Sequence, residues 1–137
     1  MHYSTEGAQW LSDSVSQHIK DLIATFYELA DSRELDAGTR MATEVFTKDA
    51  ISKSRDNAWS AVKSRKHCVL KVFLGNDGIP ELSIIGTGEI EFHNGKKINS
   101  PFACYVKLDS LDSTASVRIS FMQVIADTAP ISAVLAK

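Results

Sequence analysis

The stretch LSIIGTGEIEF, residues 82–92, decides the fold, together with the Asn94-Gly95 pair that follows it. It has the length of a long β-strand, and an Asn-Gly pair is the strongest short sequence signal for a β-hairpin. Ile98–Leu108 is again rich in strand-forming residues, so we expect it to pair back on the first strand. The second half of the chain is therefore predicted to form an antiparallel sheet.

Two further strands extend this predicted sheet. His67–Leu74 ends at the turn GNDG, residues 75–78, and Val117–Ala126 follows a polar turn. Both segments are apolar at nearly every position, which indicates that both faces of the sheet are covered. We expect helices on one face and a second copy of the chain on the outer face, in a back-to-back homodimer.

Two glycines, Gly86 and Gly88, interrupt the longest predicted strand, where glycine normally costs stability. Two interpretations are open. The glycines mark a bulge or bend that curls the sheet into a half-open cone, or they allow close packing against a helix. In either case we expect the sheet to be strongly curved.

The N-terminal half carries helical patterns. Between Ser12 and Ala30, apolar residues recur at intervals of three and four and share one helix face; they are Val15, Ile19, Leu22, Ile23, Phe26 and Leu29. A second helix is expected from Asp36, a favourable N-cap, with an inward face of Ala37, Met41, Ala42, Val45 and Phe46. A short strand at Thr47–Ser52 and a third helix at Asp56–Lys63 follow. The predicted fold is α+β, a cone-shaped α+β barrel with N-terminal helices packed on a strongly curved antiparallel sheet.

The size of the chain, 137 residues, and its ordinary composition predict one domain spanning residues 1–137. Its net charge of −2 gives no reason to expect nucleic acid or a membrane surface as a partner. No apolar run approaches the ~20 residues of a membrane span, and the first residues lack a signal-peptide pattern, so we expect a cytoplasmic protein. Cys68 and Cys104 lie in strand-like runs, where reduced and buried thiols are expected.

Five segments of the chain are IATFYELADS (23–32), EVFTKDA (44–50), WSAVKSRKH (59–67), GTG (86–88) and QVIAD (123–127). With the order of the predicted elements, they resemble SnoaL-like proteins of fungal type, within the nuclear transport factor 2-like superfamily. The resemblance spans nearly the whole chain and implies a cone-shaped pocket as the active site. Relatives include polyketide cyclases, scytalone dehydratase and meroterpenoid isomerases, whereas nuclear transport factor 2 only binds proteins, so the fold alone does not decide function.

The end of the first predicted helix also looks like scytalone dehydratase, in which a tyrosine and an aspartate at this point face the pocket. Tyr27 and Asp31 stand at the matching positions. The second pocket histidine of that enzyme has no clear counterpart, because His93 lies beside the predicted hairpin turn. The resemblance therefore does not imply the same reaction.

Isomerisation, cyclisation and dehydration require an acid, a base and a dry pocket, and often no cofactor. His67 is the first catalytic candidate, because imidazole changes charge near neutral pH. Asp31 and Tyr27 lie four residues apart, on one helix face. Asp31 could orient His67 or act as base, and Tyr27 could donate a hydrogen bond to an enolate oxygen. The alternatives are a solvated strand-end histidine, an aspartate that caps the next turn and a core tyrosine.

Six further residues are predicted to bind substrate: Trp59, Lys71, Phe73, Glu89, Tyr105 and Phe121. The aromatic side chains suit the wall of a pocket for a polycyclic or terpenoid ligand, and they equally suit a protein core. Glu89 shares a strand face with Glu91 and is either an inward base or a solvated carboxylate. Lys71 could pair with one of these glutamates, bind a substrate carboxylate or extend into solvent.

Several chemistries lack their motifs: the sequence has no phosphate-binding glycine loop, dinucleotide fingerprint, HExxH or nucleophile elbow. Its four histidines are not spaced as metal ligands, so no metal and no cofactor is expected. The predicted function is that of an isomerase or cyclase acting on a small hydrophobic substrate, an oxygenated natural product such as a polyketide or meroterpenoid in fungal secondary metabolism. This biosynthetic setting rests on the resemblance. The alternatives are a non-catalytic ligand-binding module and a protein-interaction module of the same fold.

Overall fold

The computed structural model of the chain describes residues 2–12, 15–48, 59–76, 78–111, 116–127 and 129–135. In chain order its elements are the 3₁₀ turn η1 (Tyr3–Thr5), β1 (Gln9–Trp10), α1 (Gln17–Asp31), α2 (Ala37–Arg40), the π-helical turn η2 (Met41–Val45), β2 (Val62–Leu74), β3 (Glu81–Phe92), β4 (Lys97–Leu108), β5 (Ile119–Ala126) and α3 (Ala129–Leu135). One sheet contains all five strands, in the order β1-β2-β3-β4-β5. β1 is parallel to β2, and the other neighbours are antiparallel.

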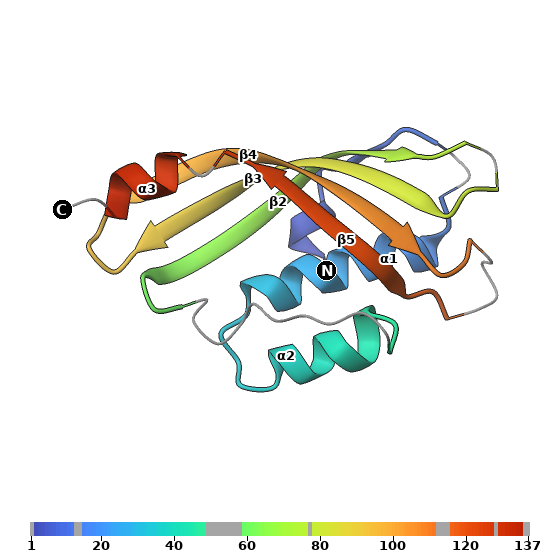
Figure 1. Ribbon diagram of the computed structural model, residues 1–137, viewed down its shortest axis with the longest axis horizontal. Helices are drawn as coiled ribbons and strands as arrows, with labels where there is room; N and C mark the ends of the chain where they lie inside the picture. The colour runs from blue at the N-terminus through green and yellow to red at the C-terminus, as the bar shows by residue number, and fades with distance from the viewer. Residues whose placement is uncertain are drawn as a thin grey trace.

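The sheet and the helices form two layers (Figure 1). α1 and α2 lie on one face of the sheet, which we call the inner face, and α3 lies beside β4 near the β3–β4 hairpin. We call the opposite face the outer face. The sheet is open, with β1 at one edge and β5 at the other. The predicted α+β class is thus confirmed. Within the described part of the chain, no helix has both the length and the apolar character needed to cross a membrane.

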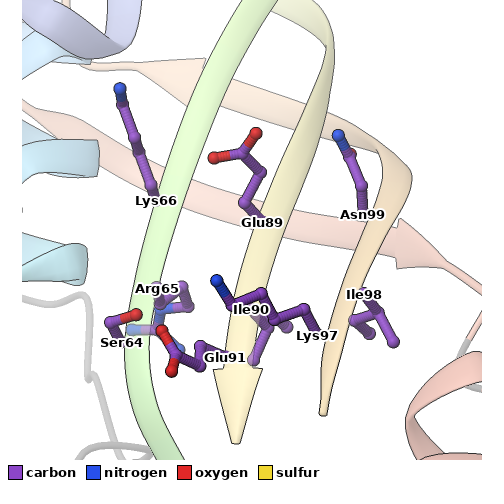
Figure 2. A pocket seen from close by; sticks show the side chains of 9 residues that line it. All are labelled: Ser64, Arg65, Lys66, Glu89, Ile90, Glu91, Lys97, Ile98 and Asn99. Atoms are coloured by element: carbon purple, nitrogen blue, oxygen red, sulfur yellow. The ribbon is translucent and has the colours of Figure 1, made fainter. Parts of the chain in front are cut away.

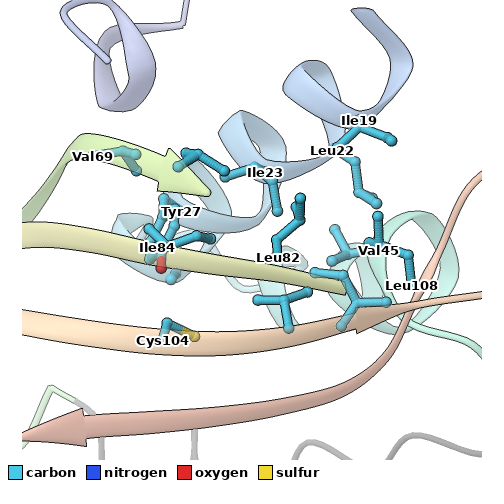
Figure 3. Close-up of a cluster of buried hydrophobic side chains, with 14 of the residues drawn as sticks. Ile19, Leu22, Ile23, Tyr27, Val45, Val69, Leu82, Ile84, Cys104 and Leu108 are labelled. Carbon is cyan, nitrogen blue, oxygen red and sulfur yellow. The ribbon is translucent and has the colours of Figure 1, made fainter. Parts of the chain in front are cut away.

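The hydrophobic core lies between α1 and the inner face (Figure 3). The predicted helix stripe is confirmed, because Ile19, Leu22 and Ile23 are buried in one cluster with Val69 and Ile84 of the sheet. Complete burial of each such side chain contributes about 1.5–3 kcal/mol. The helix begins later than predicted, and its N-cap is Ser16, whose hydroxyl accepts a hydrogen bond from the backbone N–H of Ile19 at 3.3 Å.

The segment after α1 differs from its prediction in one respect. The expected inward residues Ala37, Met41 and Val45 are buried, but Ala42 is exposed. The reason is the π-helical turn η2, in which the backbone N–H of Phe46 reaches the Met41 carbonyl, five residues earlier, at 3.1 Å. This wider turn changes which residues share a face.

Two predicted elements before the sheet are only partly described. Of the predicted strand Thr47–Ser52, Thr47 donates a backbone hydrogen bond to the Ile119 carbonyl at 2.9 Å, and the residues from 49 onward lie outside the described ranges. Residues 56–58 of the predicted third helix also lie outside them. Residues 59–63 are not helical, because β2 already begins at Val62. The prediction of a helix is wrong for this part.

The predicted hairpin at Asn94-Gly95 is confirmed. Gly95 adopts a positive φ of 84°, and its N–H bonds the Phe92 carbonyl at 3.0 Å. Phe92 N–H also bonds the Lys96 carbonyl at 2.9 Å, which closes a three-residue loop rather than a two-residue one.

The close approach at Gly86 involves strands and not a helix. Gly86 pairs with Val69 on one side and with Phe102 on the other. A Cβ atom at this position would lie 2.6 Å from the Cys68 carbonyl oxygen and 2.7 Å from Cζ of Phe102. A register shift in β2 between Val69 and Lys71 lies directly beside it. The bulge beside Gly86 therefore lies in the neighbouring strand β2, the close approach at Gly86 is not to a helix, and the curling of the sheet into a cone stays a prediction.

Candidate functional site

Asp31 is the centre of the candidate site. It is the last residue of α1, and only 4% of its side chain is exposed. Oδ2 accepts hydrogen bonds from the Tyr3 hydroxyl and from the backbone N–H of His67, both at 2.7 Å. Oδ1 lies 2.5 Å from Nδ1 of His67 and 3.5 Å from Nε of Arg65. Groups from η1, α1 and β2 thus converge on one carboxyl group.

His67 lies on the inner face of β2, opposite Gly88 of β3. Gly88 leaves room for the imidazole, because a Cβ atom there would have only His67 Cδ2 nearby, at 4.0 Å. The imidazole also contacts the rings of Tyr27 and Phe102, with centroid distances of 5.1 and 5.4 Å. About 20% of the side chain is exposed, and no described residue makes a hydrogen bond to Nε2. Nε2 is therefore the nitrogen available to a ligand.

Tyr27 precedes Asp31 by one helical turn and is buried. Its hydroxyl lies beside the Cys104 thiol, although among the described residues no partner has the geometry of a hydrogen bond to it. Burial, with a smaller contribution from Cys104, raises the pKa of Tyr27 far above its ordinary value. Burial likewise raises the pKa of Cys104 to about 11. Both groups keep their protons at neutral pH, so the phenol is a potential hydrogen-bond donor to a ligand.

The structure therefore brings together the three predicted catalytic residues, His67, Asp31 and Tyr27. It also adds Tyr3 and Arg65, which were not predicted from the sequence. Arg65 could have been predicted from the sequence, because it precedes His67 by two residues in one strand and so lies on the same face. Tyr3 could not have been predicted, because nothing in the sequence near it indicates contact with α1.

Trp59 reaches the site through Arg65. The Arg65 guanidinium lies 5.1 Å from the centre of the Trp59 ring and donates a hydrogen bond to the Ala30 carbonyl. The guanidinium of Arg33 lies 5.2 Å from the Trp59 ring. Trp59 therefore borders the site through its cation–π contact with Arg65.

Five of the predicted substrate-binding residues do not share a face with His67. Lys71, Phe73, Glu89, Tyr105 and Phe121 lie on the outer face. In β2 the cause is the register shift after Val69. Side chains alternate between the two faces of a strand, so one extra residue moves Lys71 and Phe73 to the face opposite His67. In β3 the pairing of His67 with Gly88 turns Glu89 outward. The expectation that these five line one pocket with His67 is therefore wrong.

An open hollow of about 700 Å³ lies near the β3–β4 hairpin, and most of the residues that line it belong to the outer face (Figure 2). Lys66, Glu89 and Asn99 form one row across three strands, and their side chains point the same way. The predicted pairing of Lys71 with a glutamate is not observed: Lys66 lies opposite Glu89, and Lys63 binds Glu91 at 3.1 Å.

The two cysteines lie on opposite faces of the sheet. Cys104 is buried on the inner face, whereas Cys68 is half-buried on the outer face, and both are free thiols. Among the residues that the structure describes, no group of three or more His, Cys, Asp or Glu side chains could hold a metal ion.

No protein-family model, no curated protein and no solved structure matches this chain.

Proposed function

We propose that the chain is an isomerase or cyclase that works by acid–base chemistry, with His67 as the proton-transfer group. The observation that carries the proposal is the His67–Asp31 pair, 2.5 Å between Nδ1 and Oδ1, with an aspartate that is almost completely buried. A buried carboxylate that orients an imidazole is a recurrent arrangement for general acid–base catalysis. The proposed substrate is a hydrophobic, oxygenated natural product such as a polyketide or meroterpenoid of fungal secondary metabolism.

The proposed reaction needs three groups around the substrate. Nε2 of His67 takes a proton from a carbon next to a carbonyl group, and the Tyr27 hydroxyl donates a hydrogen bond to the oxygen on which negative charge develops. The protonated imidazole then returns its proton to another atom of the same substrate, so no redox partner is required. We propose that the substrate lies against Nε2 of His67, in a cone-shaped pocket next to the hydrophobic core, where a dry environment strengthens these interactions.

Hydrogen exchange into a ketone tests this proposal without knowledge of the natural product. Polycyclic and terpenoid ketones are incubated with the protein in D₂O, and mass spectrometry measures deuterium at the carbon next to the carbonyl. We expect exchange above the buffer rate with the native protein, and only the buffer rate with His67→Gln. The control is His93→Gln, since His93 is exposed at the hairpin, and it should exchange at the native rate. Exchange that persists in His67→Gln contradicts the role of His67.

A ligand-binding module is the competing function, and the same samples distinguish it. Such a module would bind members of the ketone panel, seen as an increase in melting temperature, without any exchange above the buffer rate. The enzyme proposal predicts that His67→Gln loses exchange while its ligand-induced increase in melting temperature is retained.

The outer face favours a homodimer as the functional form, and this too is our proposal. Four large apolar side chains are exposed on it, Phe73 (37%), Ile85 (42%), Phe121 (46%) and Ile125 (61%). They lie on β2, β3 and β5, away from the hollow at the hairpin, and large apolar side chains exposed together on one sheet face usually mark an interface. Back-to-back packing of two copies would cover it with a symmetric interface.

Ile85→Glu should weaken this dimer, because it places a charge within the apolar part of the outer face. We expect sedimentation equilibrium to show a dissociation constant raised by about tenfold or more, the effect of losing a central interface residue. Leu35→Glu is the matched control, since Leu35 is fully exposed on the loop between α1 and α2. A native protein that sediments as a monomer contradicts the proposal.

A further inference from the structure

We infer that η1 is a working part of the site: Tyr3 and Arg65 are positioning residues that hold Asp31 as an anion, so that His67 carries its proton on Nδ1 and presents an unprotonated Nε2. The inference rests on the proposed function, because it makes His67 the base rather than the acid in the first step. It assigns a role to an N-terminal tyrosine that lies 28 positions from the aspartate it contacts.

The hydrogen bonds around Asp31 decide where the proton lies. Tyr3 and the backbone N–H of His67 both donate to Oδ2, and the Arg65 guanidinium lies beside Oδ1. Burial, and then the hydrogen bond to Asp31, raise the pKa of Tyr3 far above its ordinary value, so its hydroxyl keeps its proton. Donors and a positive charge stabilise an ionised carboxylate. An ionised carboxylate only accepts hydrogen bonds, so Nδ1 of His67 must be the donor at 2.5 Å.

Several contacts hold Tyr3 in place across α1 and β2. Ser4 is completely buried, and its hydroxyl lies 3.4 Å from the Ala24 carbonyl of α1. His2 contacts Glu28 of the same helix, with 3.1 Å between Nδ1 and Oε2. On the other side, the Lys66 ammonium lies 5.4 Å from the centre of the Tyr3 ring. The Tyr3 hydroxyl is thus fixed from two elements, as the positioning of a buried carboxylate requires.

The other groups that face His67 do not compete for this role. Tyr27 of α1 and Cys104 of β4 are buried and protonated, and β3 contributes Gly88, which has no side chain. Phe102 contributes an uncharged ring. Besides the backbone N–H of His67, the charge of Asp31 is therefore balanced by Tyr3 and Arg65.

Tyr3→Phe isolates the hydroxyl, because phenylalanine keeps the ring under the Lys66 ammonium and removes only the donor. The charge of Asp31 is then less neutralised and acts more strongly on His67. We therefore expect the hydrogen bond from Nδ1–H of His67 to Oδ1 of Asp31 to become stronger, and the NMR resonance of its proton to move downfield.

The test is ¹⁵N NMR of the full chain labelled in histidine, without any substrate. In the native protein with a neutral imidazole, Nδ1 of His67 should appear protonated and Nε2 unprotonated. Tyr3→Phe should move the resonance of the Nδ1–H proton downfield, whereas Tyr105→Phe, which removes a hydroxyl on the outer face, should leave it unchanged. A proton on Nε2 in the native protein overturns the inference even if Tyr3→Phe does not fold. An unchanged Nδ1–H resonance in a folded Tyr3→Phe protein also overturns it.

The inference and the proposed function can fail separately. The tautomer is read from the free protein, so a ketone panel without exchange leaves the assignment of the proton intact. Conversely, exchange that depends on His67 in a protein whose Nε2 carries the proton would uphold the enzyme and remove Tyr3 from its positioning role.

Discussion

Gly86→Ala is expected to destabilise the protein by about 3 kcal/mol, the upper end of the usual cost of overpacking a core. The added methyl group would lie 2.6 Å from the Cys68 carbonyl oxygen and 2.7 Å from the Phe102 ring. The carbonyl belongs to a paired strand and cannot move without disturbing the β2–β3 hydrogen bonds. Phe102 cannot turn aside freely either, since its ring also contacts His67 and Tyr27. Urea unfolding followed by circular dichroism measures the loss.

Gly88→Ala is the matched control, two residues along the same strand. A Cβ atom there meets only the His67 ring at 4.0 Å, an ordinary van der Waals distance. Since alanine also restricts the unfolded chain, we expect the free energy of unfolding to change by less than about 1 kcal/mol. Equal losses in the two variants would show that strand propensity, and not the close approach at Gly86, determines the cost.

Much of this fold could be predicted from the sequence because its strands are long and end at strong turn signals. Predicted and observed bounds agree closely for β3 and β4, which Gly95 separates at a positive φ. Residues 59–63 were predicted to be helical, but pairing of Val62 with Phe92 places Val62 in β2. Long-range pairing can override a short local pattern.

The candidate site was predictable only in part, for reasons of geometry. Tyr27 and Asp31 were expected to share a helix face, and their contacts with His67 follow once α1 lies on β2. The sequence did not show that Lys71 and Phe73 lie on the face opposite His67. One extra residue near Leu70 reverses which side chains of β2 point to each face, and this bulge leaves no clear trace in the sequence. Tyr3 was missed because its contact with Asp31 depends on the path of the N-terminal turn.

Asp31→Ala is expected to cost about 3–5 kcal/mol, the effect of removing one partner of a buried ion pair. Arg65 would keep a largely buried guanidinium beside an empty position, and the Tyr3 hydroxyl and the N–H of His67 would lose their acceptor. Unfolding in urea measures this loss. Asp21→Ala is the control on the same helix: 48% of the Asp21 side chain is exposed, so we expect a loss below about 1 kcal/mol.

A double-mutant cycle with Arg65→Met separates the ion pair from the other contacts of Asp31. If the guanidinium without its carboxylate causes much of the loss, removing both charges should restore part of the stability. The coupling between the two positions should then be about 1–3 kcal/mol. Two outcomes would mean that the carboxylate of Asp31 does not hold the site together. In one, Asp31→Ala lowers the free energy of unfolding no more than Asp21→Ala does; in the other, the losses of the two single variants simply add in the double variant. Stability would then come from the apolar core alone, and the geometry of His67 would have to depend on its contacts with Tyr27 and Phe102.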